Sequence, residues 1–265
     1  MGNCEVEGLM KIGFCAGPEA GPLLKEAGYD FLELNVQTHL CSEKPASEFR
    51  SELAKIKECP LPCLAANCLV PASMKLTGED TDYDKIEKYL ISVFRRAEES
   101  GIQTIVFGSG GARTVPEGFN RVIAYEQLLD FGNLAADYAG KHGVTVVVEP
   151  LNKAECNIFN STRECAQFVQ EINKPSLKLL VDSYHWHKEN EEPDAIIAAG
   201  KHLQHIHVAT YSKRLAPGAE KCEFGDFFRS LKMARYSGPV SIETFSCDIK
   251  TDAAPALSLL RSLCE

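Results

Sequence analysis

The sequence predicts an α/β protein made of one domain, a (β/α)8 TIM barrel. Apolar runs alternate with helical patterns from end to end and give eight βα units. The length of 265 residues is close to the usual length of about 250 for this fold. No linker rich in Pro, Gly or Ser interrupts the series. An open doubly wound sheet is the alternative, but the chain lacks a dinucleotide-binding fingerprint, which disfavours it.

The apolar runs are predicted to be buried parallel strands, because such strands lack polar alternation. In chain order they cover residues 11–15, 29–36, 62–69, 103–108, 145–149, 177–182, 204–207 and 239–243. The intervening helices are predicted over residues 21–27, 46–57, 83–100, 124–142, 161–172, 193–199, 224–236 and 251–264. Residues 83–100 carry an apolar stripe of helical period, and Ser161 with Glu164 forms a capping box.

The composition is that of an ordinary globular protein, with 45% hydrophobic and 25% charged residues. A net charge of −9 disfavours nucleic acid and anionic membranes as partners. The 11 cysteines include no pair with zinc-site spacing, which predicts free thiols in a reducing, cytoplasmic compartment. No apolar stretch is long enough to span a membrane, and no signal peptide is recognisable. We expect residues 1–10 to be a disordered N-terminal extension.

Four strands are predicted to end at a metal-binding side chain. These residues are Glu149, Asp182, His207 and Glu243. Charged side chains are seldom buried unless they are paired or bind a metal. The C-terminal ends of barrel strands surround the mouth where this fold places its sites. Three carboxylates and one imidazole therefore predict one divalent cation, Mn²⁺, Mg²⁺ or Co²⁺, with Zn²⁺ as a further candidate.

Other polar residues follow the same strands. Glu155 lies in the loop after Glu149, where a solvated carboxylate is the simpler interpretation. His185 follows Asp182 closely enough to reach the site, although it could instead be a core histidine. His205 shares a strand face with His207 and is expected to fill the barrel or to support that ligand.

Basic residues after two strands are candidate contacts for an anionic or hydroxylated substrate. Arg113 ends a glycine-rich segment, residues 108–113, which matches no phosphate-binding fingerprint and is equally consistent with a tight turn. Lys213 and Arg214 follow the seventh strand and could act as a clamp or be solvated. Glu33 interrupts the second apolar run and is expected to point into the barrel, with its role open.

The predicted ligands suit proton transfer next to a carbonyl group. A cation bound to two neighbouring oxygens of an α-hydroxy ketone stabilises the enediolate that forms when a proton leaves the carbon. One carboxylate can remove that proton, and a second on the other face can return it. Return to the same carbon gives epimerisation, and return to the neighbouring carbon gives isomerisation.

Several motifs together resemble the xylose isomerase-like TIM barrels, in particular the D-tagatose/D-psicose 3-epimerase branch. The motifs are Glu-Pro-Leu-Asn at 149–152, Val-Asp-x-Tyr-His at 181–185, His-Ile-His-Val-Ala at 205–209 and Ser-Ile-Glu at 241–243. The resemblance covers nearly the whole chain, including Asn67 and Cys68. It implies that the four predicted ligands bind the metal and that Glu149 and Glu243 are the acid and base groups.

The resemblance also implies contacts to substrate hydroxyls by Glu155, by His185 and by an arginine after the metal histidine. Lys213 occupies that arginine position here, and Arg214 follows it. Asn67 and Arg113 complete the candidate substrate-binding residues. The branch usually reads Asn-Arg-x-Glu where this chain reads Asn-Lys-Ala-Glu at 152–155.

The expected function is that of a divalent-metal-dependent sugar isomerase or epimerase acting on a ketose or related polyol. We expect an unphosphorylated substrate, because the loop after the eighth strand, residues 244–248, has no glycine or basic residue. A homodimer or homotetramer is compatible with the sequence. Inosose dehydratase and hydroxypyruvate isomerase are alternatives on the same scaffold. An apurinic endonuclease is less favoured, because it needs three zinc ions and more ligands.

Overall fold

The eight strands pair in chain order and in parallel, and the last strand closes the sheet against the first. The protein is seen here as a computed structural model that describes residues 10–265. The strands are β1 (Ile12–Cys15), β2 (Phe31–Asn35), β3 (Cys63–Asn67), β4 (Thr104–Phe107), β5 (Thr145–Val148), β6 (Leu177–Asp182), β7 (Leu203–Val208) and β8 (Val240–Ile242). The predicted (β/α)8 barrel is confirmed.

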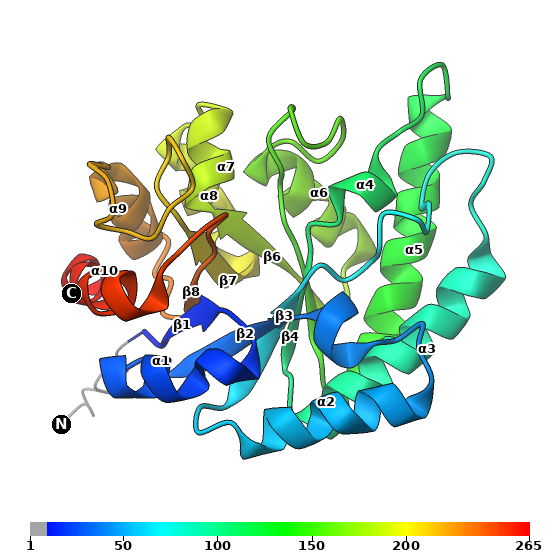
Figure 1. Cartoon of the computed structure of the whole chain (residues 1–265). Coiled ribbons are helices and arrows are strands. Elements are labelled where there is room, and N and C mark those ends of the chain that lie inside the picture. Colours follow the sequence, from blue (N-terminus) through cyan, green and yellow to red (C-terminus); the bar gives the residue numbers. More distant parts are fainter. Residues whose placement is uncertain (1–9) are drawn as a thin grey trace, which may run out of the picture.

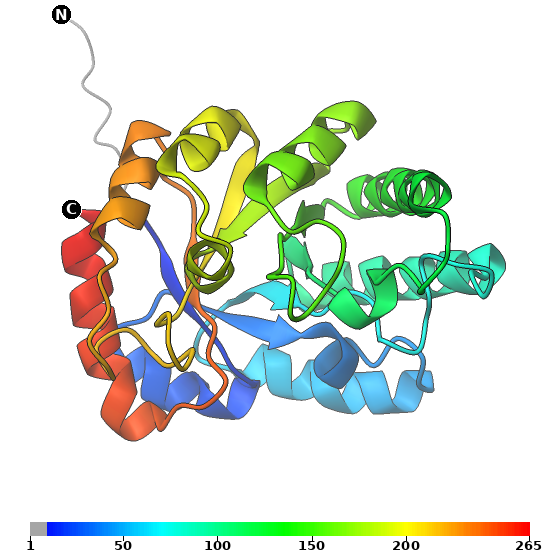
Figure 2. The same cartoon turned by 90° about the horizontal axis from the view of Figure 1, so that it is seen from above.

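Helices surround the strands, as Figures 1 and 2 show from the side and from above. They are α1 (Gly21–Ala27), α2 (Ala46–Glu58), α3 (Tyr83–Ser100), α4 (Gly110–Arg113), α5 (Arg121–Lys141), α6 (Thr162–Ile172), α7 (Ser183–Lys188), α8 (Pro193–Ala199), α9 (Gly225–Met233) and α10 (Ile249–Cys264). Three shorter turns are η1 (Pro18–Ala20), η2 (Val36–Leu40) and η3 (Gly200–His202). The sequence did not predict α4, α7 or these short turns.

Side-chain caps explain where several helices begin. The Ser161 hydroxyl accepts a hydrogen bond from the Glu164 amide at 3.2 Å, which confirms the predicted start of α6. The helix predicted at 124–142 begins earlier, at Arg121, because the Asn120 side chain accepts from the Val122 amide at 2.8 Å. An aspartate cap extends α10 in the same way, to Ile249 rather than residue 251.

The inner face of the barrel changes from apolar to polar toward the C-terminal ends of the strands. Lower in the barrel, Val106, Val147 and Leu180 form a buried apolar cluster. Two residues further along β5 and β6 come Glu149 and Asp182, which share that face because successive strand residues alternate sides. The larger apolar core joins residues of the outer strand faces and the helices. The fold therefore gathers polar side chains at one end of the barrel.

Met10 is buried, and its carbonyl accepts a hydrogen bond from the Arg261 guanidinium at 3.0 Å. The expectation of a disordered extension over residues 1–10 is therefore wrong at Met10, and its other residues, 1–9, lie outside the described part. Within residues 10–265, no helix is both long and apolar enough to cross a membrane.

Candidate metal centre and active site

The four expected ligands meet at the mouth of the barrel. Glu149 and Glu243 directly follow β5 and β8, Asp182 ends β6, and His207 lies in β7. One ligand atom from each residue lies within 4.8 Å of those of the other three. Glu149, Asp182 and His207 are buried, and Glu243 is partly exposed. The structure thus brings together the complete set that the sequence predicted.

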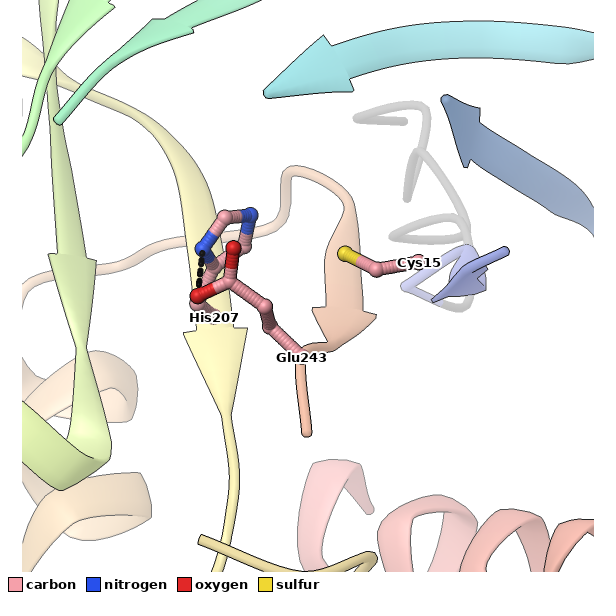
Figure 3. A group of neighbouring side chains, drawn as sticks. All are labelled: Cys15, His207 and Glu243. Atoms are coloured by element: carbon pink, nitrogen blue, oxygen red, sulfur yellow. Dashed lines mark ion pairs between the residues drawn. The ribbon is translucent and has the colours of Figure 1, made fainter. Parts of the chain in front are cut away.

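Buried polar atoms on two of the predicted ligands have no hydrogen-bond partner. They are Glu149 Oε1 and His207 Nδ1, which lie 3.4 Å apart. His207 Nδ1 is also 3.3 Å from Glu243 Oε2, the ion pair drawn in Figure 3. Buried polar atoms are rarely left without a partner, and a divalent cation between these side chains would coordinate them. The residues present therefore fit a metal ion.

Glu33 contacts His207, one of the four predicted ligands, from across the barrel. Its Oε1 atom lies 2.8 Å from His207 Nε2, and its Oε2 atom lies 2.7 Å from His205 Nε2. This contact occupies Nε2 of His207 and leaves Nδ1 to face the other ligands. His205 therefore contacts the same carboxylate that holds His207, which agrees with a supporting position inside the barrel. The role of Glu33 was not predictable, because it depends on a partner 174 residues away in the sequence.

The two glutamates have different electrostatic surroundings. Burial raises the pKa of Glu149, and the nearby charge of Glu243 adds to that effect. Burial also raises the pKa of Glu243, but His207 and Arg214 outweigh it and lower that pKa to about 2. Burial lowers the pKa of His207, whereas Glu33 and Glu243 raise it well above its ordinary value. Two carboxylates held in unlike surroundings can take different parts in one proton transfer.

Arg214, and not its neighbour Lys213, is the basic residue that contacts the predicted ligands. Its Nη2 atom donates to Asp182 Oδ2 at 2.9 Å and also to Glu243 Oε2. Its guanidinium carbon lies 4.9 Å from the ring centroids of both Tyr184 and Phe245. Lys213 is exposed and does not line the cavity beside the ligands, so the structure does not bring it to the cluster. The chain is left-handed at Arg214, with φ at 53°, so neighbouring side chains do not follow a regular alternation.

His185 and Glu155, which the resemblance expects to contact substrate hydroxyls, lie beside the predicted ligands. The Asn152 amide donates to His185 Nδ1 at 3.1 Å, so the proton of a neutral ring is on Nε2. That Nε2 atom is 3.8 Å from Asp182 Oδ2 and 4.0 Å from Glu155 Oε2. His185 can therefore donate a hydrogen bond toward the site.

Asn67 also reaches the site, from the end of β3. Its Nδ2 atom donates to Glu243 Oε1 at 3.0 Å, so one oxygen of that carboxylate is held by an amide from the far side of the barrel. Asn67, Arg214 and Glu243 line a cavity of about 290 Å³ together with Cys15, Glu33 and Cys68. A larger cavity, of about 680 Å³, includes Lys11, Gln103 and Pro239 and lies at the N-terminal ends of the strands, away from the ligands.

Arg113 is buried and its guanidinium contacts backbone carbonyl groups. Its side chain is fully buried and donates to the carbonyl oxygens of Phe107 at 3.0 Å and Glu149 at 2.7 Å. The structure therefore does not bring Arg113 to the cavity beside the predicted ligands. The glycine-rich segment has a steric purpose instead, since a Cβ atom on Gly108 would lie 2.3 Å from Glu149 Oε2. Gly108 thus makes room for a metal ligand.

The chain is thus a closed (β/α)8 barrel with four potential metal ligands at its mouth. The chain belongs to the xylose isomerase-like TIM barrel family, whose model matches residues 22–263. The family resemblance that the motifs suggested is therefore confirmed.

Curated relatives with similar sequences are named as epimerases. The L-ribulose 3-epimerase of Methylomonas sp. (strain DH-1) is 36% identical over 115 residues, which are 43% of this chain and 40% of that protein. The ketose 3-epimerase of Arthrobacter globiformis is 32% identical over 124 residues, 46% of this chain and 42% of that protein. The matched part thus spans about two fifths of these relatives.

Among solved structures, the D-psicose 3-epimerase of Clostridium cellulolyticum H10, crystallised with D-tagatose, superposes with a TM-score of 0.82. The match covers 97% of this chain and 100% of that chain at 18% identity. At this identity the likeness shows the shared fold.

Proposed function

We propose that the protein is a divalent-metal-dependent sugar epimerase or isomerase that acts on a free ketose. The observation that carries the proposal is that Glu149 and Glu243 both reach one metal-ligand cluster from separate strands. Glu149, Asp182, His207 and Glu243 would hold the cation. When bound, it supplies Lewis-acid stabilisation of negative charge on the substrate. The oxygen-rich set favours Mn²⁺, Mg²⁺ or Co²⁺ over a thiolate-type zinc site.

The two glutamates perform the proton transfer in this proposal. One carboxylate removes the proton from the hydroxyl-bearing carbon next to the carbonyl, and the electron pair of the broken C–H bond moves toward the carbonyl oxygen. The other glutamate then donates a proton to the opposite face of the same carbon. The result is the epimer, with one carboxyl protonated and the other ionised until they exchange protons with solvent.

The surrounding polar groups would position the sugar. His185 offers an Nε2–H donor, Arg214 offers a guanidinium, and Glu155 offers a carboxylate beside the ligands. Asn67 holds Glu243 in place by its hydrogen bond. Arg113 and Lys213 do not line the cavity, and the Arg214 guanidinium that does is already paired with Asp182 and Glu243. This arrangement supports an unphosphorylated substrate.

The names of the matched relatives support a ketose substrate and reaction at its third carbon. The net charge of −9 supports a sugar rather than a nucleic-acid partner. All cysteines from Cys15 to Cys264 in the described part are free thiols, which supports a reducing compartment such as the cytoplasm.

NMR of ketoses incubated with the metal-loaded protein in D2O tests this function. We expect deuterium to enter one ketose at the carbon next to the carbonyl, together with formation of its epimer. A panel of ketoses and their phosphates identifies the substrate, and chelation should stop exchange. Exchange in no member of the panel by protein with one metal per chain would refute the proposal. Loss of water from an inosose, or cleavage of abasic DNA, would point to the alternative functions.

A further inference from the structure

A thiol faces the metal ligands from the first strand. Cys15 is the last residue of β1 and is partly buried. Figure 3 shows its sulfur pointing toward the Glu243 carboxylate and the His207 ring, which lie next to each other. The Cys15 sulfur, a ring nitrogen of His207 and a carboxylate oxygen of Glu243 lie within 4.8 Å of one another.

Barrel closure places Cys15 there. Phe14 pairs with Ile242 across the seam between β1 and β8, so Cys15 and Glu243, the next residue after each of them, are at the same level. Cys15 also pairs with Glu33, whose side chain points into the barrel. The position of the thiol beside the ligands is therefore a consequence of the strand register.

The neighbouring histidine offers an atom suited to a shared cation. His207 is fully buried, and its Nδ1 atom has no hydrogen-bond partner. Bonds from zinc to sulfur and nitrogen measure about 2.3 Å and 2.0–2.1 Å, so two such ligands lie at most about 4.4 Å apart. The three ligand atoms lie within 4.8 Å of one another, so they would move inward when they bind a cation. Sulfur and imidazole are ligands that thiophilic cations prefer.

We propose that Cys15, His207 and Glu243 form a second ligand set that holds a thiophilic divalent cation, Zn²⁺ or Cd²⁺. This set shares two members with the oxygen-rich set, so a cation bound to one excludes a cation from the other. Binding displaces the thiol proton to solvent, because a coordinating cysteine is a thiolate. Cys15 is thereby a residue that determines metal selectivity. The inference rests on the proposed metal site but not on the proposed turnover.

Titration with Cd²⁺ tests this inference by a readout independent of catalysis. The purified protein should develop the ultraviolet charge-transfer absorption of a Cd–thiolate bond, and Mn²⁺ should compete with it. In Cys15→Ala and Cys15→Ser this component should disappear. We expect Cd²⁺ affinity to fall at least about 100-fold, since loss of an outer-shell partner alone costs about 10–100-fold. Mn²⁺ affinity should change much less.

Cys68→Ser is the matched control, because Cys68 lines the same cavity but is outside the three-residue set. Cys68→Ser should retain the Cd–thiolate absorption that Mn²⁺ suppresses. Competition by Mn²⁺ also distinguishes Cd²⁺ at this site from Cd²⁺ bound to the other thiols. An unchanged Cd–thiolate component in both Cys15 variants would overturn the inference. An equal loss of Mn²⁺ and Cd²⁺ affinity would also overturn it, because Cys15 would then only support the structure. Absence of sugar turnover would contradict the proposed function and leave these binding results unaffected.

Discussion

Glu33 Oε1 lies 2.8 Å from His207 Nε2, and this contact joins β2 to β7 across the interior of the barrel. The same carboxylate contacts His205, so one buried acid holds two imidazole rings. A histidine ligand keeps one tautomer and one ring orientation when its second ring nitrogen is hydrogen-bonded to a carboxylate. The contact is thus part of the metal site, although Glu33 itself is outside the four-ligand set.

Glu33→Gln should weaken Mn²⁺ binding by about 10–100-fold, because an amide cannot accept from two imidazoles as a carboxylate does. Isothermal titration calorimetry measures the affinity. Glu98→Gln is the matched control, since Glu98 contacts His142 Nδ1 at 2.7 Å on the surface. Equal Mn²⁺ affinities in the wild type and Glu33→Gln would show that the contact does not support the ligand.

Glu149→Gln and Glu243→Gln should each abolish turnover while the protein stays folded. Loss of a general base costs about 10²–10⁴-fold, and a weakened metal site adds to this loss. Steady-state rates on the identified ketose, with circular dichroism as the folding check, measure the effect. The exposed Glu126→Gln is the control and should keep the wild-type rate. Near-normal turnover in either site variant would exclude the mechanism with two glutamates.

Gly108→Ala should lower Mn²⁺ affinity and turnover together. The added methyl group would lie 2.3 Å from Glu149 Oε2, so the carboxylate must move away from the other ligands. Gly225→Ala adds the same atom at a position with no neighbour within 4 Å and should leave both quantities unchanged. Metal titration and rate measurements on the two variants make the comparison. If Gly108→Ala kept the wild-type Mn²⁺ affinity and turnover, the Glu149 carboxylate could be displaced without loss of either.

Arg113→Met should destabilise the fold by about 2–4 kcal/mol, because it leaves buried carbonyl oxygens without their charged donor. Urea unfolding measures the free energy of unfolding. Arg229→Met, which removes an exposed guanidinium paired with Asp226, should change it by less than about 0.5 kcal/mol. If Arg113→Met instead kept its stability and weakened substrate binding, Arg113 would be a substrate contact after all.

Stability should fall as pH rises through the range in which Glu191 titrates. Burial raises the pKa of Glu191 from 4.5 to about 7, against the opposing hydrogen bonds from Thr162. Between these values the folded state binds a proton more readily than the unfolded state, so the free energy of unfolding decreases with increasing pH. Glu191→Gln should flatten this slope, whereas the exposed Glu192→Gln should keep it. Unfolding curves from pH 4.5 to 7 show whether the slope depends on Glu191.

The strand ends and the four ligands were predictable because each depends on a local pattern, an apolar run followed by a charged or imidazole side chain. The position of Glu33 and Cys15 beside the ligands was not predictable, because it depends on which inward-facing residues share a level in the closed barrel. The directions in which the Arg113 and Lys213 side chains point were not predictable for a related reason. The sequence places both after strands, but only backbone geometry decides whether a side chain turns to the cavity, to solvent or to a carbonyl.

Closure of β8 against β1 also sets when the metal centre can exist. Glu243 directly follows the last strand and is held by Asn67 from the third, 176 residues earlier. A nascent chain emerging from the ribosome, N-terminus first, lacks the final ligand until β8 has been synthesised. Partly synthesised chains therefore cannot assemble all four predicted ligands, which come together only once the barrel has closed.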